Sequence, residues 1–341
     1  MSEQKQTTDR YTVGDLEKWN GIARDVNPPI RLGVLGDPVA HSLSPQMQNA
    51  ALEACQMGTQ YARFHIRGNE LRSALSFLRK LDFIGINLTV PHKIAAAGHV
   101  DELDESARRC GAVNTIKIEP GNRNHQPVAD QAATAKETPT AHSAAATADD
   151  QKLIGFNTDG EGFVRAVRAE FSVDVRDLRV MILGAGGGTG RAIVWQCALE
   201  NCERLLLVNR TLEKAHTLVE QLRPFFSGPR VLGPAARLEA LTFDETAMRL
   251  QLSEIDLIVN ATPLGMNRSD PPPVPGRLLA PHHMVFDCVY GTSKSALLQA
   301  AEQAGARGAN GLSMLLYQGA LSFSIWFDRE PPIEAMRNAL L

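Results

Sequence analysis

Lys93 and Asp159 are of residue types that can take part in proton transfer. Lys93 closes the polar segment Asn87-Leu-Thr-Val-Pro-His-Lys93, and Asp159 lies at a turn before a helical stretch. A lysine ammonium can donate a proton to an oxygen that gains negative charge, and a neighbouring carboxylate favours the charged ammonium. Taken singly, each residue has a simpler interpretation, as a solvated lysine or as a helix-capping aspartate.

Hydroxyl and amide side chains follow the short apolar runs of the first half of the chain. Ser42 and Ser44 come just after the first run, where α/β sheets place their ligands. Ser44 before Pro45 is also typical of a helix N-cap with a first-turn proline, whereas Ser42 is not needed for that cap. Asn114 ends a later apolar run. The two serines therefore favour the binding of a polar ligand.

A glycine-rich turn, Gly184-Ala-Gly-Gly-Gly-Thr-Gly190, connects an apolar strand to a helical pattern. Glycines let the backbone approach a pyrophosphate, which the amides and dipole of the helix start then stabilise. The spacing is not the strict dinucleotide-binding pattern, because Thr189 holds the sixth position and Gly190 comes one residue late. Arg210 ends the next strand, where an acidic residue would favour NAD, and its guanidinium can pair with a 2′-phosphate. This arginine predicts NADP as the cofactor.

Alternating strands and helices must position these segments. The alternation in the first half implies a parallel sheet covered by helices, and the second half has the profile of a nucleotide-binding unit. In the first half we expect strands at 32–35, 61–66 and 83–90, with helices at 45–56 and 71–81. In the second half we expect strands at 178–183, 204–208, 257–259 and 284–289, with helices at 190–199 and 213–222.

Two segments interrupt or precede this alternation. Residues 1–29 carry few apolar residues and are expected to form an N-terminal extension, so that the fold starts near Ile30. Residues 120–150 are rich in Ala, Thr and Pro, and Val128 is their only large aliphatic residue. Such a composition cannot bury enough apolar surface to order itself, which predicts a solvated low-complexity insertion.

The composition excludes several classes of function. The 341 residues contain 44% hydrophobic residues, enough for two domains with their own cores. Thirty-five Lys and Arg against 38 Asp and Glu give a net charge of −3, without the positive excess that nucleic-acid binding needs. No apolar run approaches the roughly 20 residues that span a membrane. Five scattered cysteines predict reduced thiols in a cytoplasmic protein, and His282-His283 lacks metal-ligand spacing, so no metal is expected.

Taken together and in order, these motifs resemble the shikimate dehydrogenase family. The resemblance runs from about Arg31 to Trp326, apart from the insertion. Its motifs are Gly36 to Pro45, Asn87 to Lys93, Gly111 to Thr115, Asn157 to Gly160, Asn209 to Thr211, Asn260 to Met266, Asp287 to Tyr290, Gly311 to Leu315, and Gln318-Gly319.

The resemblance implies a reversible reduction of 3-dehydroshikimate to shikimate with NADPH, in the chorismate pathway to aromatic amino acids. It implies that Lys93 and Asp159 are catalytic, which agrees with the need for a proton donor when a hydride reaches a ketone. Ser42 and Ser44 would bind the substrate carboxylate. The substrate hydroxyls and ring would be held by Asn87, Thr89, Asn114 and Gln318, with Tyr290 nearby. The cofactor would contact Gly184, Ala185, Gly186, Gly187, Gly188, Asn209, Arg210, Thr211, Thr262 and Gly311.

We therefore expect an α/β protein with a discontinuous N-terminal α/β substrate domain, residues 30–158 with 311–341, and a Rossmann-type NADP-binding domain, residues 159–310. Two other functions stay open: a quinate/shikimate dehydrogenase of dual specificity, which would use the same Lys93 and Asp159, and a non-catalytic ligand sensor on the same fold. Arg210 favours NADP and biosynthesis over NAD and quinate breakdown. The sequence is compatible with a homodimer but does not determine the oligomeric state.

Overall fold

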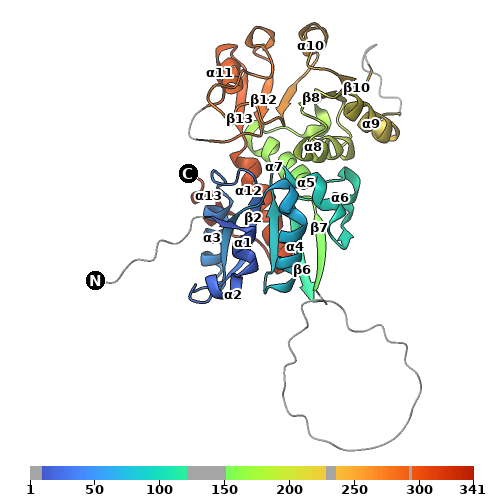
Figure 1. Cartoon of the computed structure of the whole chain (residues 1–341). Coiled ribbons are helices and arrows are strands. Elements are labelled where there is room, and N and C mark those ends of the chain that lie inside the picture. The colour runs from blue at the N-terminus through green and yellow to red at the C-terminus, as the bar shows by residue number, and fades with distance from the viewer. Residues whose placement is uncertain (1–9, 121–150, 228–235, 292–293) are drawn as a thin grey trace, which may run out of the picture.

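Two β-sheets with covering helices form the molecule, one above the other in Figure 1. The computed structural model describes residues 10–120, 151–227, 236–291 and 294–341. The predicted insertion lies outside the described residues except for Pro120, which ends one strand and pairs with Gln151 of the next. Within the described ranges, no helix is long and apolar enough to cross a membrane.

The first sheet has seven strands in the order β1-β3-β2-β4-β6-β7-β5. Its predicted parallel arrangement is wrong for β6, which pairs antiparallel with β4 and with β7. Apolar runs mark where strands occur, but they carry no information about strand direction. The strands are β1 (Tyr11–Thr12), β2 (Ile30–Gly36), β3 (Gln60–His65), β4 (Gly85–Leu88), β5 (Glu102–Leu103), β6 (Thr115–Pro120) and β7 (Gln151–Phe156).

Residues 11–22 belong to this fold, which corrects the expectation that the fold starts near Ile30. β1 adds to the edge of the sheet beside β3, and the short helices α1 (Val13–Glu17) and α2 (Trp19–Ile22) follow it. Trp19 is 7% exposed, and its ring lies 5.6 Å from Phe64 and 5.5 Å from Phe83. A few large aromatic side chains thus anchor a segment whose overall composition is polar.

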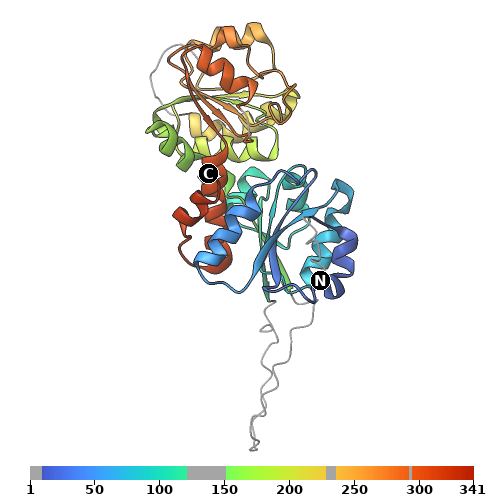
Figure 2. The same ribbon diagram turned by 90° about the vertical axis from the view of Figure 1, so that its left-hand side faces the viewer.

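The end of the chain returns to the first sheet. Helices α12 (Leu312–Phe327) and α13 (Ile333–Asn338) pack beside α3 (Ser44–Ala54), as the lower half of Figure 2 shows. The opposite face is covered by α1 and α4 (Leu71–Lys80). Two shorter helices, α5 (His92–Ala95) and α6 (Glu105–Cys110), follow strand ends, and single 3₁₀ turns occur at Gly68–Glu70, Ala96–Gly98, Val175–Asp177, Arg223–Phe226 and Gly276–Leu278.

The second sheet is parallel, with six strands in the order β10-β9-β8-β11-β12-β13. Chain order reverses beside β8, which is where open α/β sheets bind ligands. Side chains of β8 alternate between the two cores that cover its faces. The strands are β8 (Arg179–Leu183), β9 (Arg204–Val208), β10 (Leu238–Leu241), β11 (Leu257–Asn260), β12 (Met284–Asp287) and β13 (Arg307–Asn310), and the helices are α7 (Asp159–Phe171), α8 (Gly188–Leu199), α9 (Leu212–Leu222), α10 (Glu245–Leu252) and α11 (Ala296–Gln303).

Replacing Trp19 tests whether the N-terminal residues are part of the core. We expect Trp19→Ala to lower the free energy of unfolding by about 3–5 kcal/mol, because it removes a large buried ring. Urea unfolding of both proteins measures this difference. Ile22→Ala is the control on the same helix, because Ile22 is 38% exposed. Equal effects of the two substitutions would contradict a structural role for the N-terminal residues.

Candidate active site

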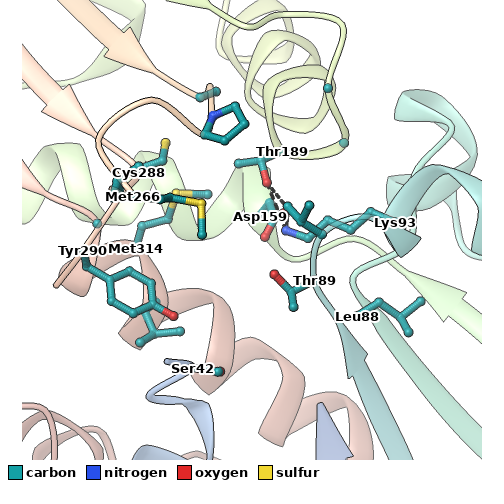
Figure 3. A pocket seen from close by; sticks show the side chains of 18 of the residues that line it. Ser42, Leu88, Thr89, Lys93, Asp159, Thr189, Met266, Cys288, Tyr290 and Met314 are labelled. Carbon is teal, nitrogen blue, oxygen red and sulfur yellow. Dashed lines mark hydrogen bonds and ion pairs between the residues drawn. The ribbon is translucent and has the colours of Figure 1, made fainter. Parts of the chain in front are cut away.

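The carboxyl ends of strands from both sheets border one pocket of about 450 Å³. Residues that follow β2 and β4 form one side, and residues that follow β8, β11 and β12 form the other. α12 contributes Met314, Leu315 and Gln318. Figure 3 shows Lys93, Asp159 and Thr189 grouped on one side of the pocket, across from Tyr290. The chain thus brings residues more than 200 positions apart to one cleft.

Lys93 and Asp159 form an ion pair in this pocket, with 2.6 Å between Nζ and Oδ2. The side chains are only 13% and 4% exposed, so solvent screens the pair weakly. The second carboxylate oxygen of Asp159 accepts a hydrogen bond of 2.9 Å from Asn114 Nδ2. The amide of Asp159 donates to Asn157 Oδ1, and the carboxylate makes no capping bond to α7. The aspartate is therefore oriented toward the lysine rather than used as a helix cap.

A buried hydrogen-bond network supports the pocket from below. Asn87 Nδ2 donates to Thr115 Oγ1 and Ser322 Oγ, and Asn87 Oδ1 accepts from the Tyr61 hydroxyl at 2.8 Å. Thr115 Oγ1 donates in turn to Asn114 Oδ1. Because buried polar groups without partners are costly, such a network holds each side chain in one orientation. It fixes Asn87 and Asn114 relative to the ion pair.

Ser42 and Ser44 line the pocket with Tyr290. Ser44 is the first residue of α3 and makes no side-chain cap, so its predicted capping role is wrong. The helix starts at Ser44, one residue earlier than predicted. The Ser44 amide donates a hydrogen bond of 3.3 Å to Ser42 Oγ. Arg63 Nη2 donates to the Ser42 carbonyl at 2.9 Å. Burial raises the pKa of Tyr290 above its ordinary value.

The glycine turn connects β8 to α8, as predicted. Gly184 has φ = +83°, in the region that favours glycine. A Cβ at Gly190 would lie 2.2 Å from the Gly184 carbonyl oxygen, so this glycine allows helix and turn to meet. The Gly186 amide donates to Asn209 Oδ1 at 3.1 Å, which joins the turn to the end of β9.

The geometry of this turn fits a dinucleotide. α8 has 12 residues, and its first-turn amides have no partners within the helix. A Cβ built at Gly187 would meet only the Gly184 carbonyl oxygen, at 3.4 Å, and both Gly187 and Gly188 line the pocket. Arg210 is exposed just after β9. The turn therefore offers an open backbone surface and amide donors for a pyrophosphate, with the Arg210 cation just after the next strand.

Most of the predicted site residues line one pocket. Asn114 does not border the pocket but contacts it through Asp159. The other predicted residues outside the pocket lie at the ends of β8 and β9, and they are Gly184, Ala185, Gly186, Asn209, Arg210 and Thr211. The predicted residues that do line it are Lys93, Asp159, Ser42, Ser44, Asn87, Thr89, Tyr290, Gln318, Gly187, Gly188, Thr262 and Gly311.

Sequence reasoning missed several pocket residues. Thr189 is one of them, and it accepts a hydrogen bond of 3.0 Å from Lys93 Nζ. Its place in the glycine turn was the signal that could have identified it. Met266, Cys288 and Met314 also line the pocket, and their types carry no signal that separates them from core residues. His41 borders it from the loop after β2.

Comparison with known proteins agrees with this geometry. Residues 34–116 match the family model described as the shikimate dehydrogenase substrate binding domain, and residues 311–341 match that of the shikimate 5′-dehydrogenase C-terminal domain. A shikimate dehydrogenase (NADP(+)) from Methanopyrus kandleri is 37% identical over 91% of this chain and 94% of its own length.

Solved structures extend the similarity to three dimensions. A shikimate dehydrogenase in complex with NADP+ is 33% identical with a TM-score of 0.72, and the match covers 91% of this chain and 93% of the other. The enzyme from Thermus thermophilus in complex with NADP(H) and shikimate is 30% identical with a TM-score of 0.69, covering 91% and 98%. By these similarities, the chain belongs to the shikimate dehydrogenase family.

Proposed function

We propose that this protein is an NADP-dependent shikimate dehydrogenase that reversibly reduces 3-dehydroshikimate to shikimate, in the chorismate pathway to aromatic amino acids. One observation carries the proposal: the buried Lys93–Asp159 pair lies in a pocket bordered by hydroxyl and amide side chains on one side and by the glycine turn on the other. A proton donor thus lies between a site for a polyhydroxylated acid and a site for a dinucleotide. The family membership of the chain supports the same reaction.

The substrate carboxylate would bind at the serine side of the pocket. Ser42, Ser44 and Tyr290 supply three hydroxyl groups there. The Arg63 guanidinium, bonded to the Ser42 carbonyl, adds positive charge behind the loop. Hydrogen bonds to a carboxylate are stronger than those between neutral groups, so several hydroxyls can fix the acid end of the substrate.

The ring and its hydroxyls would then face Asn87, Thr89 and Gln318, which line the same pocket as the serines and Lys93. Asn114 would act from behind them, because its amide donates to Asp159 and to Gln318 Oε1. A site built from fixed amides rejects molecules that lack the matching hydroxyl, since its polar groups would be left unpaired. This arrangement supports selection of a polyhydroxylated ring.

The chemistry divides between the cofactor and the protein. NADPH, when bound, supplies the hydride to the ketone of 3-dehydroshikimate. Lys93 donates a proton to the ketone oxygen as that oxygen gains negative charge. Asp159 holds the ammonium in place through its Oδ2, and Asn114 holds Asp159. In the oxidation of shikimate, the same pair takes up the proton of the substrate hydroxyl.

The cofactor residues would be the glycine turn from Gly184 to Gly188, the loop Asn209 to Thr211, Thr262 and Gly311. Asn209 joins the first two of these segments, because it accepts from the Gly186 amide and donates to the Thr211 carbonyl. Arg210 would bind the 2′-phosphate, since an exposed guanidinium beside this loop can form two parallel hydrogen bonds to it.

Three further proposals concern the chain as a whole. The domain boundaries would lie near residues 158 and 310, with the described N-terminal residues added to the substrate domain. Cys55, Cys110, Cys197 and Cys288 are free thiols, which supports a cytoplasmic location. A homodimer stays a prediction, which sedimentation of the purified protein would measure.

Initial rates test the function directly. Purified protein is assayed with shikimate and quinate, each with NADP and with NAD. We expect the highest kcat/KM for shikimate with NADP, because Arg210 suits a 2′-phosphate. Strong turnover of quinate or with NAD would instead indicate the enzyme of dual specificity, and binding without turnover would indicate a ligand sensor.

Replacing the lysine tests the proton donor. We expect Lys93→Ala to lower kcat by about 10²- to 10⁴-fold, the usual contribution of general acid–base catalysis, with a much smaller change in the KM for shikimate. Lys117→Ala is the control, because Lys117 is paired with Glu119 on β6 and does not line the pocket. Near-normal turnover of Lys93→Ala would remove Lys93 from the mechanism.

Replacing the arginine tests cofactor choice. Arg210→Ala removes a cation proposed to pair with the 2′-phosphate, and a hydrogen bond to a charged group contributes about 1.5–3 kcal/mol. We therefore expect the KM for NADP to rise by about 10- to 100-fold. Kinetics of the same variant with NAD serve as the control and should change little. An equal loss with both cofactors would contradict a role specific to the phosphate.

A further inference from the structure

We propose that Thr189 is a positioning residue, whose hydroxyl aims the Lys93 ammonium at the reacting oxygen of the substrate. The proposal rests on the proposed function, because it assigns Thr189 a role in the proton-transfer step of that reaction. Thr189 belongs to the glycine turn, yet its side chain reaches the catalytic lysine instead of its own helix (Figure 3).

Three polar groups meet at this point of the cleft. Lys93 Nζ donates to Asp159 Oδ2 at 2.6 Å and to Thr189 Oγ1 at 3.0 Å. The Thr189 hydroxyl is 3.5 Å from Asp159 Oδ2 and can donate to it. The threonine therefore accepts from the ammonium and donates toward the carboxylate, a combination that a hydroxyl can provide and a methyl group cannot.

The two bonds set the direction of the third N–H of Lys93. An ammonium carries three donors in tetrahedral geometry, so fixing two of them leaves one direction for the last. Among the described residues, Lys93 Nζ has no third partner, and Lys93 lines the pocket. Without Thr189, the ammonium would keep only its hydrogen bond to Asp159 and could rotate about it. The third N–H would then no longer point in one direction.

The start of α8 is fitted closely to the lysine. A Cβ at Gly188 would lie 2.8 Å from Lys93 Cβ, so the absence of a side chain lets the helix approach the lysine stem. The helix itself does not use the hydroxyl, because its N-cap is Gly187 and no side chain caps it. Thr189 is thereby placed beside the ammonium by backbone contacts rather than by its own flexibility.

This contact crosses between the two sheets. Lys93 lies on α5, which follows a strand of the first sheet, whereas Thr189 lies on α8, which follows a strand of the second. The orientation of the Lys93 ammonium consequently depends on how the glycine turn packs against α5. A shift of about 1 Å in such a group can cost 10²-fold in rate.

The test compares Thr189→Val, Thr189→Ser and the unchanged protein in shikimate oxidation with NADP. Valine keeps the shape of threonine without the hydroxyl, and we expect it to lower kcat about 10- to 100-fold, the range for a lost hydrogen bond to a charged group. The KM for shikimate and the Kd for NADP, measured by calorimetry, should stay within about twofold. Serine keeps the hydroxyl and should restore most of kcat.

A double-mutant cycle separates positioning from mere packing. If Thr189 acts through Lys93, Thr189→Val should cause little further loss in the Lys93→Ala background, because residues that act as a unit are not additive. Thr217→Val is the matched control, since Thr217 lies on α9 and bonds only within that helix among the described residues. It should leave kinetics unchanged.

Four outcomes would overturn the proposal: normal kcat in Thr189→Val, a rise in KM or Kd alone, failure of serine to restore kcat, or additive losses in the double mutant. If the unchanged protein is inactive with shikimate and NADP, the proposed function fails and this role of Thr189 fails with it. An active unchanged protein with an unimpaired valine variant would overturn the role of Thr189 alone.

Discussion

The rest of the site depends on the burial of one ion pair. Removing an ammonium and a carboxylate from water costs several kcal/mol per ion, which is offset only when their geometry is good and their remaining hydrogen-bonding capacity is filled. Here Asn114 donates a hydrogen bond to the second carboxylate oxygen of Asp159, and Thr189 accepts a hydrogen bond from Lys93 Nζ. These partners come from β-strand ends and helices of both sheets. The pair is therefore completed by partners from both halves of the chain.

Parallel strands in both sheets explain why the two sheets meet at the binding pocket. Strands that run in one direction deliver their following loops to one edge, and the two sheets present those edges to each other. Asn87 from β4 and Gly187 from the turn after β8 thus face one pocket. The network through Tyr61 and Ser322 lies beneath it, so the polar side chains are held by structure that carries no chemistry of its own.

Much of this arrangement could be predicted from the sequence. The expected strand 204–208 agrees with β9, and Lys93 and Asp159 are paired as predicted. Most of the motifs follow the end of a strand, whereas Gly111 to Thr115 precedes β6 and Gln318-Gly319 lies within α12. Failures had physical causes: Trp19 anchors a segment whose average composition is polar, β6 runs antiparallel although apolar runs hold no direction, and Thr189 contacts a residue 96 positions away. Composition and periodicity are local, and they cannot report contacts between distant elements.

The pairing of Pro120 with Gln151 has a consequence for how this chain can vary. The two residues lie at the far end of an antiparallel pair whose other end, at Thr115 and Phe156, adjoins the site. A segment that leaves and re-enters the fold at adjacent positions adds little conformational penalty as it grows, about 0.6 kcal/mol for each doubling of its length. The closeness of Pro120 and Gln151 therefore means that the length of the chain between them is not set by a distance it must span.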